Sequence, residues 1–406
     1  MKIPLIIFFW IFGLCFLSNF SIGGLYPVTY VTGILVGIGL IGYIFGISFY
    51  GVKKTINDTR HVRLNKLINS YNYLLYLILP FILILLVKFI ILIVSDPSAV
   101  TRQSLFGNSD SHSILFGSQA IELLYIIFIA SFIKVLVIIG FYLSIQTKRI
   151  KYLLIANLIF IVDSIIFLGR GFILEFIFQL IFYILIYKYI NIKLSKFYKF
   201  STLFIVIFLI FFGSIISKVR GDSDVINLTD FFYSQVVNYH TVGFVILDNE
   251  LNNIRSPINI SNTYGLATLG VLERIAVLII RRFDKSIDSV SGQNGEYLAE
   301  FRALGYNANG DQLNYNAFGT IFYTFYQDGG FIFVFFGMLI YGFFLSKAYY
   351  KVRCGNDSYI PFLYLLFQMG FNSVFFSPLE SSIFWIVVIV LFLFRYISLN
   401  GYNKTS

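Results

Sequence analysis

The apolar positions of the chain form long uninterrupted runs and do not alternate with polar positions. A helix needs about 20 apolar residues to cross the hydrocarbon core of a bilayer. The pattern therefore predicts an all-α polytopic membrane protein with about ten transmembrane helices, and it excludes an outer-membrane barrel. The expected spans are residues 3–22, 27–49, 70–94, 114–145, 152–168, 172–187, 200–217, 329–346, 358–376 and 381–398.

One long polar stretch, residues 218–316, separates the first seven expected spans from the last three. It is too long and too patterned for a linker, and long loops usually carry function. We therefore divide the chain into transmembrane helices one to seven (1–217), a large extracytoplasmic loop (218–316) and transmembrane helices eight to ten (317–406).

Two parts of the large loop have helical patterns. Residues 229–247 carry an apolar stripe, and residues 263–280 are apolar except for Glu273 and Arg274, which suits an amphipathic helix at the membrane interface or a re-entrant helix. An alternative topology has twelve spans, in which 263–280 and 313–328 both cross the bilayer. The Glu-Arg pair disfavours it, because charges at the centre of a bilayer are costly.

Composition and charge support the membrane assignment and orient the chain. Only 12% of the residues are charged, and the mean hydropathy is +0.82, whereas an ordinary soluble domain is about 25% charged. With a cytoplasmic N-terminus, the loops on the cytoplasmic side hold most of the Lys and Arg residues, and the short outside connections hold only Arg102 and Arg170. We therefore expect a multi-pass protein of the cytoplasmic (inner) membrane with both termini cytoplasmic. The net charge of +10 then indicates lipid contact and not nucleic acid binding.

Two glycine-flanked arginines are expected at the outer headgroup level. Gly169-Arg170-Gly171 interrupts a long apolar stretch and is typical of a hairpin tip, and Arg220-Gly221 follows the seventh span. A guanidinium can bind phosphate oxygens with two parallel hydrogen bonds, and glycine allows a ligand to approach the backbone. Together they suit a lipid-linked pyrophosphate; the alternative is that each Arg simply reaches water at a helix end.

Three more arginines lie on or just after the apolar segment 263–280, and they extend the possible phosphate or sugar site. They are Arg274, Arg281 and Arg282. The alternative is interfacial anchoring to lipid phosphates. His240, in the same loop, is a candidate base or a structural residue.

The chain offers little for metal or cofactor chemistry. Asp222-Ser223-Asp224 has the D-x-D spacing that holds a divalent ion in many glycosyltransferases, but a solvated turn is the simpler interpretation. Cys15 and Cys354 are expected in different compartments. The phosphate-binding and hydrolase motifs of soluble enzymes are absent from the sequence. We expect neither a metal nor a cofactor.

Two adjacent motifs precede the eighth span: Asn316-Ala317-Phe318-Gly319-Thr320, and then Tyr326-Gln327-Asp328-Gly329-Gly330. With the Gly-Arg-Gly hairpin, the Arg-Gly pair and the large outside loop, they make the chain resemble the Wzy-type O-antigen and capsular polysaccharide repeat-unit polymerases. That family often shows an N-x-x-x-T helix followed by an aromatic-x-D-x-G start of the next span. Arg281 with Gly292 also fits the R-x10-G pattern of some members.

The resemblance implies a GT-C-like fold and a glycosyltransferase that works on the outer face of the membrane. The donor would be a growing glycan on undecaprenyl pyrophosphate, and the acceptor would be a new lipid-linked repeat unit. A chain-length regulator and a flippase are the implied protein partners, beside membrane lipids; no nucleic acid is implied.

The resemblance also implies roles for single residues. Arg170 and Arg220 would stabilise the leaving pyrophosphate. Substrate-binding roles fall to Arg274, Arg281, Arg282 and Asn316. Asp328, Glu273 or His240 would act as the base for the acceptor hydroxyl.

Three other functions fit parts of the sequence. An O-antigen ligase would share the lipid donor, and His240 keeps that option, but in ligases the large loop lies nearer the C-terminus. A polysaccharide flippase or other transporter would show repeated bundles and short loops. A membrane O-acyltransferase would carry a His within a span.

The orientation can be tested by cysteine labelling with a membrane-impermeant reagent on intact cells. We expect a Ser261→Cys variant to be labelled at position 261, because the large loop faces outward, and we expect Cys354 to react only after permeabilisation. Labelling at 354 and protection at 261 would reverse the predicted topology.

Overall fold

The computed structural model describes residues 2–50, 64–96, 104–105, 113–169, 171–190, 237–260, 262–281, 283–284, 286–287, 289–307, 310–315 and 319–399. The chain forms two compact units. Unit 1 comprises Met1–Ile56, Ile226–Lys351 and Leu365–Trp385, and unit 2 comprises Asn57–Val225, Val352–Tyr364 and Ile386–Ser406.

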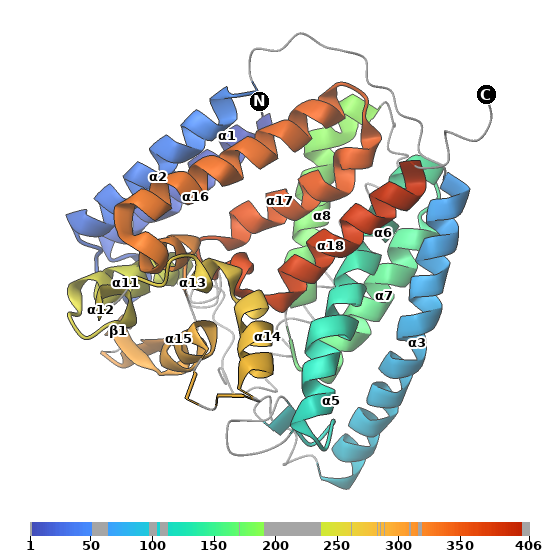
Figure 1. The fold of residues 1–406 in the computed structure, drawn as a ribbon, viewed down its shortest axis with the longest axis horizontal. Coiled ribbons are helices and arrows are strands. Elements are labelled where there is room, and N and C mark those ends of the chain that lie inside the picture. Colours follow the sequence, from blue (N-terminus) through green and yellow to red (C-terminus); the bar gives the residue numbers. More distant parts are fainter. Residues whose placement is uncertain are drawn as a thin grey trace. The chain divides into compact units, whose positions relative to one another are not determined.

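The structure is mostly helical (Figure 1). Within the described ranges, five helices are long and apolar enough to cross a membrane, which is compatible with a polytopic membrane protein. They are Lys2–Phe20, Tyr30–Ser48, Leu64–Ser95, Ile121–Thr147 and Ile321–Arg353, with shorter apolar helices at Phe172–Tyr187 and Ser382–Ile397. The expected span 200–217 lies outside the described residues.

Unit 1 contains the N-terminal helices, the described part of the large loop and most of the long helix α16. Its elements are α1 (Lys2–Leu17), α2 (Tyr30–Ser48), α11 (Tyr239–Asn252), α12 (Pro257–Ile260), α13 (Leu266–Leu269), α14 (Val271–Ile280), α15 (Val290–Ala299), β1 (Arg302–Tyr306), β2 (Gln312–Tyr315), α16 (Ile321–Arg353) up to residue 351, the second half of α17 (Ile360–Asn372), the 3-10 turn η7 (Pro378–Glu380) and the start of α18 (Ser382–Leu399).

Unit 2 is a bundle in which α6 contacts both α3 and α7. Its elements are α3 (Leu64–Ser95), α5 (Gln119–Leu124), the π-helical turn η4 (Tyr125–Ile129), α6 (Ala130–Thr147), α7 (Lys151–Ile166), α8 (Gly171–Ile190), η6 (Asp357–Tyr359) and the remaining parts of α17 and α18.

The expected hairpin between α7 and α8 is confirmed. α7 ends at Ile166, Leu168 adopts a left-handed conformation (φ 48°), and α8 begins at Gly171 and contacts α7. Arg170, which comes between the two helices in the sequence, lies outside the described residues. Two acids near this connection, Asp163 and Glu175, are engaged within unit 2. Tyr125 donates a hydrogen bond to Asp163, and Lys134 forms an ion pair with Glu175.

The long helix α16 starts earlier than the expected span 329–346 and is broken in the middle. Helical geometry fails at Gly329 and Gly330, and Gly330 is left-handed (φ 64°). The short arm before the break folds back on the long arm. This is seen at Gly337, where a Cβ atom would lie 2.6 Å from the ring of Phe325. Glycine adopts the left-handed conformation of residue 330 at little cost, because it carries no Cβ atom.

The same geometry argues against the twelve-span topology. The short arm of α16, residues 321–328, is about 12 Å long at the rise of an α-helix. α14 has 10 residues, about 15 Å, and Gly270 (φ 43°) separates it from α13. Neither segment crosses a hydrocarbon core of about 30 Å.

One element was not expected in an all-α protein. β1 and β2 form an antiparallel hairpin, which is closed by a hydrogen bond from the Asn307 amide to the Asp311 carbonyl (2.9 Å). The hairpin also joins the connection between α1 and α2, where the Tyr26 amide donates to the Leu304 carbonyl (2.8 Å). This polar segment lacks the apolar periodicity on which the sequence prediction relied, so the hairpin was not predicted.

Several contacts within unit 1 join segments that the predicted topology puts on the same side of the membrane. The Lys2 amide donates to the Tyr349 hydroxyl, so two ends that are both expected inside meet. The large loop contacts the connection expected outside between the first two spans, where the Tyr26 amide donates to the Leu304 carbonyl, and Asp248 binds Thr29 at the start of the second span.

Glycines bring α2 and α16 into backbone contact, and α1, α2 and the long arm of α16 lie side by side (Figure 1). A Cβ atom on Gly42 would overlap the carbonyl oxygen of Phe335, and one on Gly46 would overlap that of Leu339. Small residues at helix interfaces are the usual means of close packing in membranes, where the hydrophobic effect drives no helix association.

We expect Gly46→Ala to destabilise the protein by about 1–3 kcal/mol, because the added methyl group meets backbone that cannot rotate away. Gly37→Ala is the matched control: it lies on the same helix with no atom within 4 Å of its Cβ position. It should be neutral or stabilising by up to about 1 kcal/mol. Thermal unfolding of the detergent-solubilised protein measures both; equal midpoints for the two variants would contradict the packing.

Candidate functional site

The structure describes four of the eight predicted site residues, all in unit 1: Asp328, His240, Arg274 and Arg281. The other four lie outside the described residues, as do the acids of the D-x-D motif. They are Arg170, Arg220, Arg282 and Asn316.

Asp328 is a fully buried carboxylate at the end of the short arm of α16. It accepts hydrogen bonds from the Thr263 hydroxyl (2.5 Å) and from the backbone amides of Gly265 (2.9 Å), Ala267 (3.0 Å) and Thr268 (3.0 Å). These amides belong to the first turn of α13, whose N–H groups have no partner within the helix. Asp328 therefore caps α13, and its role as a base stays a prediction.

Two other buried carboxylates have the same role at other helices. Glu273 of α14 accepts from the Ser289 hydroxyl (2.7 Å) and the Val290 amide (2.9 Å) at the start of α15. Asp248 of α11 accepts from the Thr29 amide (2.9 Å) and hydroxyl (2.5 Å) at the start of α2. Negative charge is favoured at a helix N-terminus by both the free amides and the helix dipole.

His240 lies among aromatic rings at the beginning of α11. Its ring centroid is 5.3 Å from that of Trp10, 5.5 Å from that of Phe375 and 5.7 Å from that of Tyr239. These rings come from α1, α11 and the segment after α17, so His240 takes part in the packing that joins them. Its role in catalysis stays a prediction.

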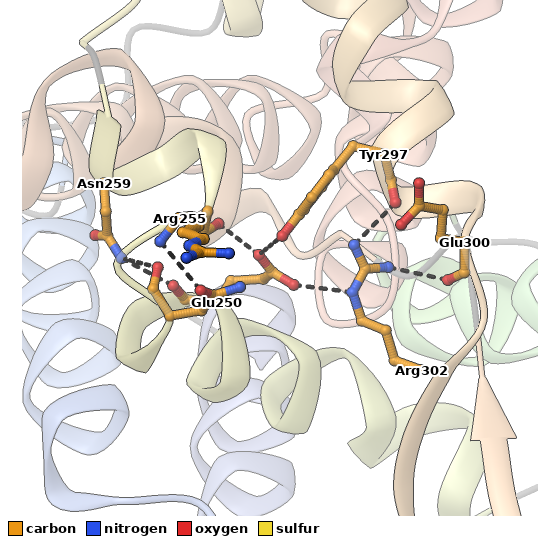
Figure 2. Close-up of polar contacts among 8 residues, drawn as sticks. Glu250, Arg255, Asn259, Tyr297, Glu300 and Arg302 are labelled. Atoms are coloured by element: carbon orange, nitrogen blue, oxygen red, sulfur yellow. Dashed lines mark hydrogen bonds and ion pairs between the residues drawn. The ribbon is translucent and has the colours of Figure 1, made fainter.

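A buried ion pair holds the described part of the large loop together (Figure 2). Glu250 of α11 is fully buried, and its Oε1 lies 3.0 Å from the Nε of Arg302 in β1. Its other oxygen accepts from the Tyr297 hydroxyl (2.8 Å) and from the Ser256 hydroxyl. Arg302 also donates to the carbonyl oxygens of Tyr297 and Glu300. With these partners the pair joins α11, α15 and β1 without leaving a buried charge unpaired.

Glu380 lies in the turn η7, which precedes α18 and contacts α13. Its Oε1 accepts a hydrogen bond from the Thr324 hydroxyl (2.5 Å) in the short arm of α16. Its backbone lies against the break between α13 and α14: a Cβ atom on Gly270 would be 2.6 Å from the Glu380 Cα. Only glycine allows this approach, so the break positions the turn.

The Glu380 carboxyl is titratable near neutral pH. Burial raises its pKa to about 7; the Thr324 hydrogen bond and the charge of Arg274 lower the pKa, and the charge of Asp328 raises it. Nothing in the sequence marks Glu380, because it stands in a short connection outside the apolar runs and belongs to no motif. The available signal was its position alone: an acid between two spans, on the side of the large loop.

Arg274 is exposed on α14, and its Nη2 lies 3.1 Å from the Cβ position of Gly295 in α15. Arg281, just after α14, is also exposed and donates from Nε to the Ile287 carbonyl (2.7 Å). The helix between them exposes apolar side chains, including Ile275 and Ile279. Exposed cations on an otherwise apolar helix are typical of contact with the headgroup region of a bilayer.

Within the part of the chain that the structure describes, no group of three or more His, Cys, Asp and Glu residues is placed to hold a metal ion. The arrangement offers instead a cation on α14 (Arg274) and a titratable carboxyl in η7 (Glu380), which accepts a hydrogen bond from the buried Thr324 hydroxyl of α16. Such a set can bind an anionic group and transfer a proton.

Comparison of the chain with family models, with curated proteins and with solved structures finds no match.

Removing a capping carboxylate should cost stability, whatever the protein does. We expect Asp328→Ala to lower the free energy of unfolding by about 3 kcal/mol, because four donors lose a charged acceptor in a buried position. Glu296→Ala, an exposed acid on α15, is the control and should change it by less than about 0.5 kcal/mol. Chemical denaturation in detergent measures both; an Asp328→Ala protein as stable as the control would contradict the capping role.

Proposed function

We propose that the chain is a glycosyltransferase that polymerises lipid-linked oligosaccharide repeat units, on undecaprenyl pyrophosphate, at the outer face of the cytoplasmic membrane. The product is an O-antigen or capsular polysaccharide. The observation that carries the proposal is the exposed Arg274 on the apolar helix α14, whose charge acts on the titratable Glu380. We propose about ten spans and a GT-C-like architecture for the whole chain.

The chemistry of the donor explains why this edge is suitable. A lipid pyrophosphate keeps its isoprenoid chain in the bilayer and its phosphates at the headgroup level. A short apolar helix that carries arginines can lie at that depth, with the apolar side chains toward lipid and the guanidiniums toward phosphate. Arginine suits the phosphate oxygens because its planar donors bind two of them together.

In the proposed reaction a hydroxyl oxygen of the acceptor sugar attacks the anomeric carbon of the donor glycan. The bond between that carbon and the pyrophosphate oxygen breaks, and lipid pyrophosphate leaves with the bonding electrons. Negative charge develops on the leaving group, so cations positioned in advance lower the barrier. The hydroxyl proton passes to a base.

Arg170 and Arg220 are proposed as the residues that bind the leaving pyrophosphate, with Arg274, Arg281, Arg282 and Asn316 as substrate-binding residues. The packing of the large loop on the connection expected outside supports a site on that side, since the β-hairpin binds Tyr26 and Asp248 binds Thr29 at the start of the following span. The substrates are the lipid-linked repeat unit and the lipid-linked growing chain.

We expect Arg170→Ala, Arg220→Ala and Arg274→Ala to reduce long-chain glycan by about 100-fold or more in a strain that lacks the native gene, because each loses positive charge at the leaving group. Membrane levels of the protein should not change. Gel analysis of the glycan measures chain length, and Arg255→Ala, an exposed arginine of the same loop, is the control and should restore full-length glycan.

The glycan left in the deletion strain identifies the step. A polymerase defect leaves glycans of a single repeat unit at the cell surface. If repeat units accumulated on the cytoplasmic side instead, the chain would be a flippase. If long glycan formed but stayed on its lipid carrier, it would be a ligase.

A further inference from the structure

We propose that Glu380 is the proton acceptor for the attacking hydroxyl, an inference that rests on the proposed function. Its carboxyl accepts a hydrogen bond from the Thr324 hydroxyl of α16 and is influenced by the charge of Arg274 on α14, and its turn lies against Gly270 at the break between α13 and α14. In the step, the acceptor O–H bond breaks as the new C–O bond forms, and its proton passes to Glu380. The carboxylate becomes a neutral acid, and the electrons of the old C–O bond leave with the pyrophosphate.

The other buried acids of unit 1 are occupied by several donors each. Asp328 accepts four hydrogen bonds, and Glu273, Asp248 and Glu250 are held by amides, hydroxyls or a guanidinium. These contacts join different elements of the unit. Glu380 differs, because within the described ranges its carboxyl accepts only the Thr324 hydroxyl, at Oε1. Its Oε2 is therefore available to a substrate hydroxyl.

The groups around Glu380 adjust its basicity in opposite directions. Arg274 on α14 and the Thr324 hydroxyl stabilise the carboxylate, while burial and the charge of Asp328 on α16 favour the neutral acid. Burial prevails and raises the pKa to about 7. A base with a pKa near the working pH is both substantially ionised and strong enough to accept a proton.

The sign of the pH dependence follows. The base acts in its ionised form, so the rate should rise with pH through about 7 and then level off. Removing Arg274 or the Thr324 hydroxyl removes a contribution that lowers the pKa, so each change should move the midpoint to higher pH. These shifts of the pH midpoint would show that Glu380 titrates during the reaction, whereas a purely structural Glu380 would leave the midpoint unchanged.

The first experiment needs no sugar substrate. Infrared difference spectra of the purified protein in detergent follow the C=O band of protonated carboxyl groups while the pH is changed. We expect a component with a midpoint near 7 that disappears in Glu380→Gln and shifts upward in Thr324→Val. A spectrum in which Glu380→Gln removes no component near 7, or removes one near the ordinary glutamate value of about 4.3, would overturn the proposal.

The second experiment measures polymer length in the deletion strain. We expect Glu380→Gln to reduce long-chain glycan by about 100-fold or more while the lipid-linked repeat unit still reaches the outer face. Glu380→Asp should restore part of the activity, which also shows that the turn still folds. Glu296→Gln, the exposed acid on α15, is the control.

The outcomes separate the two proposals. If wild type restores long glycan to the deletion strain and Glu380→Gln restores it equally, the proton acceptor is another group and the polymerase proposal stands. If deletion of the gene leaves glycan length unchanged, the proposed function is wrong. The proposal for Glu380 as a proton acceptor in that reaction is then wrong as well.

Discussion

The fold of unit 1 depends on buried carboxylates that cap helices belonging to other segments. Every helix begins with amides that have no acceptor within the helix, and at a membrane boundary an unpaired amide is costly. Asp248 provides the acceptor for α2, Asp328 for α13 and Glu273 for α15. Each bond also joins two segments that are far apart in sequence, so the same interaction satisfies the backbone and fixes the tertiary contact.

Short helices become possible because of these caps. α13 has only 4 residues and α14 and α15 have 10 each, lengths at which an isolated helix is unstable in water. Breaks at Gly270 and Gly330 end one helix and allow the next to start in a new direction. The caps then hold the new start in place, and the ion pair of Glu250 and Arg302 joins the remaining elements.

The sequence predicted the long helices well and the large loop poorly, for physical reasons. Apolar runs such as 27–49 and 70–94 correspond to α2 and α3, because burial in lipid leaves helix as the way to satisfy the backbone. The break in α16 and the β-hairpin depend on glycine conformation and on distant partners, which no local periodicity reports. Asp328 and Glu273 were named from the sequence as candidate bases. Their capping role could not be predicted, because the amides that they bind lie in other parts of the chain.

The capping scheme also explains why one acid of this unit has a different character. The carboxylates of Asp328, Glu273 and Asp248 each accept hydrogen bonds from amides of another segment. Such an acid anchors one element to another. Among the described residues, the Glu380 carboxyl accepts a single hydroxyl, and neither that bond nor the charge of Arg274 offsets the desolvation that raises its pKa to about 7. The number of donors around each carboxylate therefore distinguishes the acids that join the elements of this fold from Glu380, which accepts one hydroxyl at its edge.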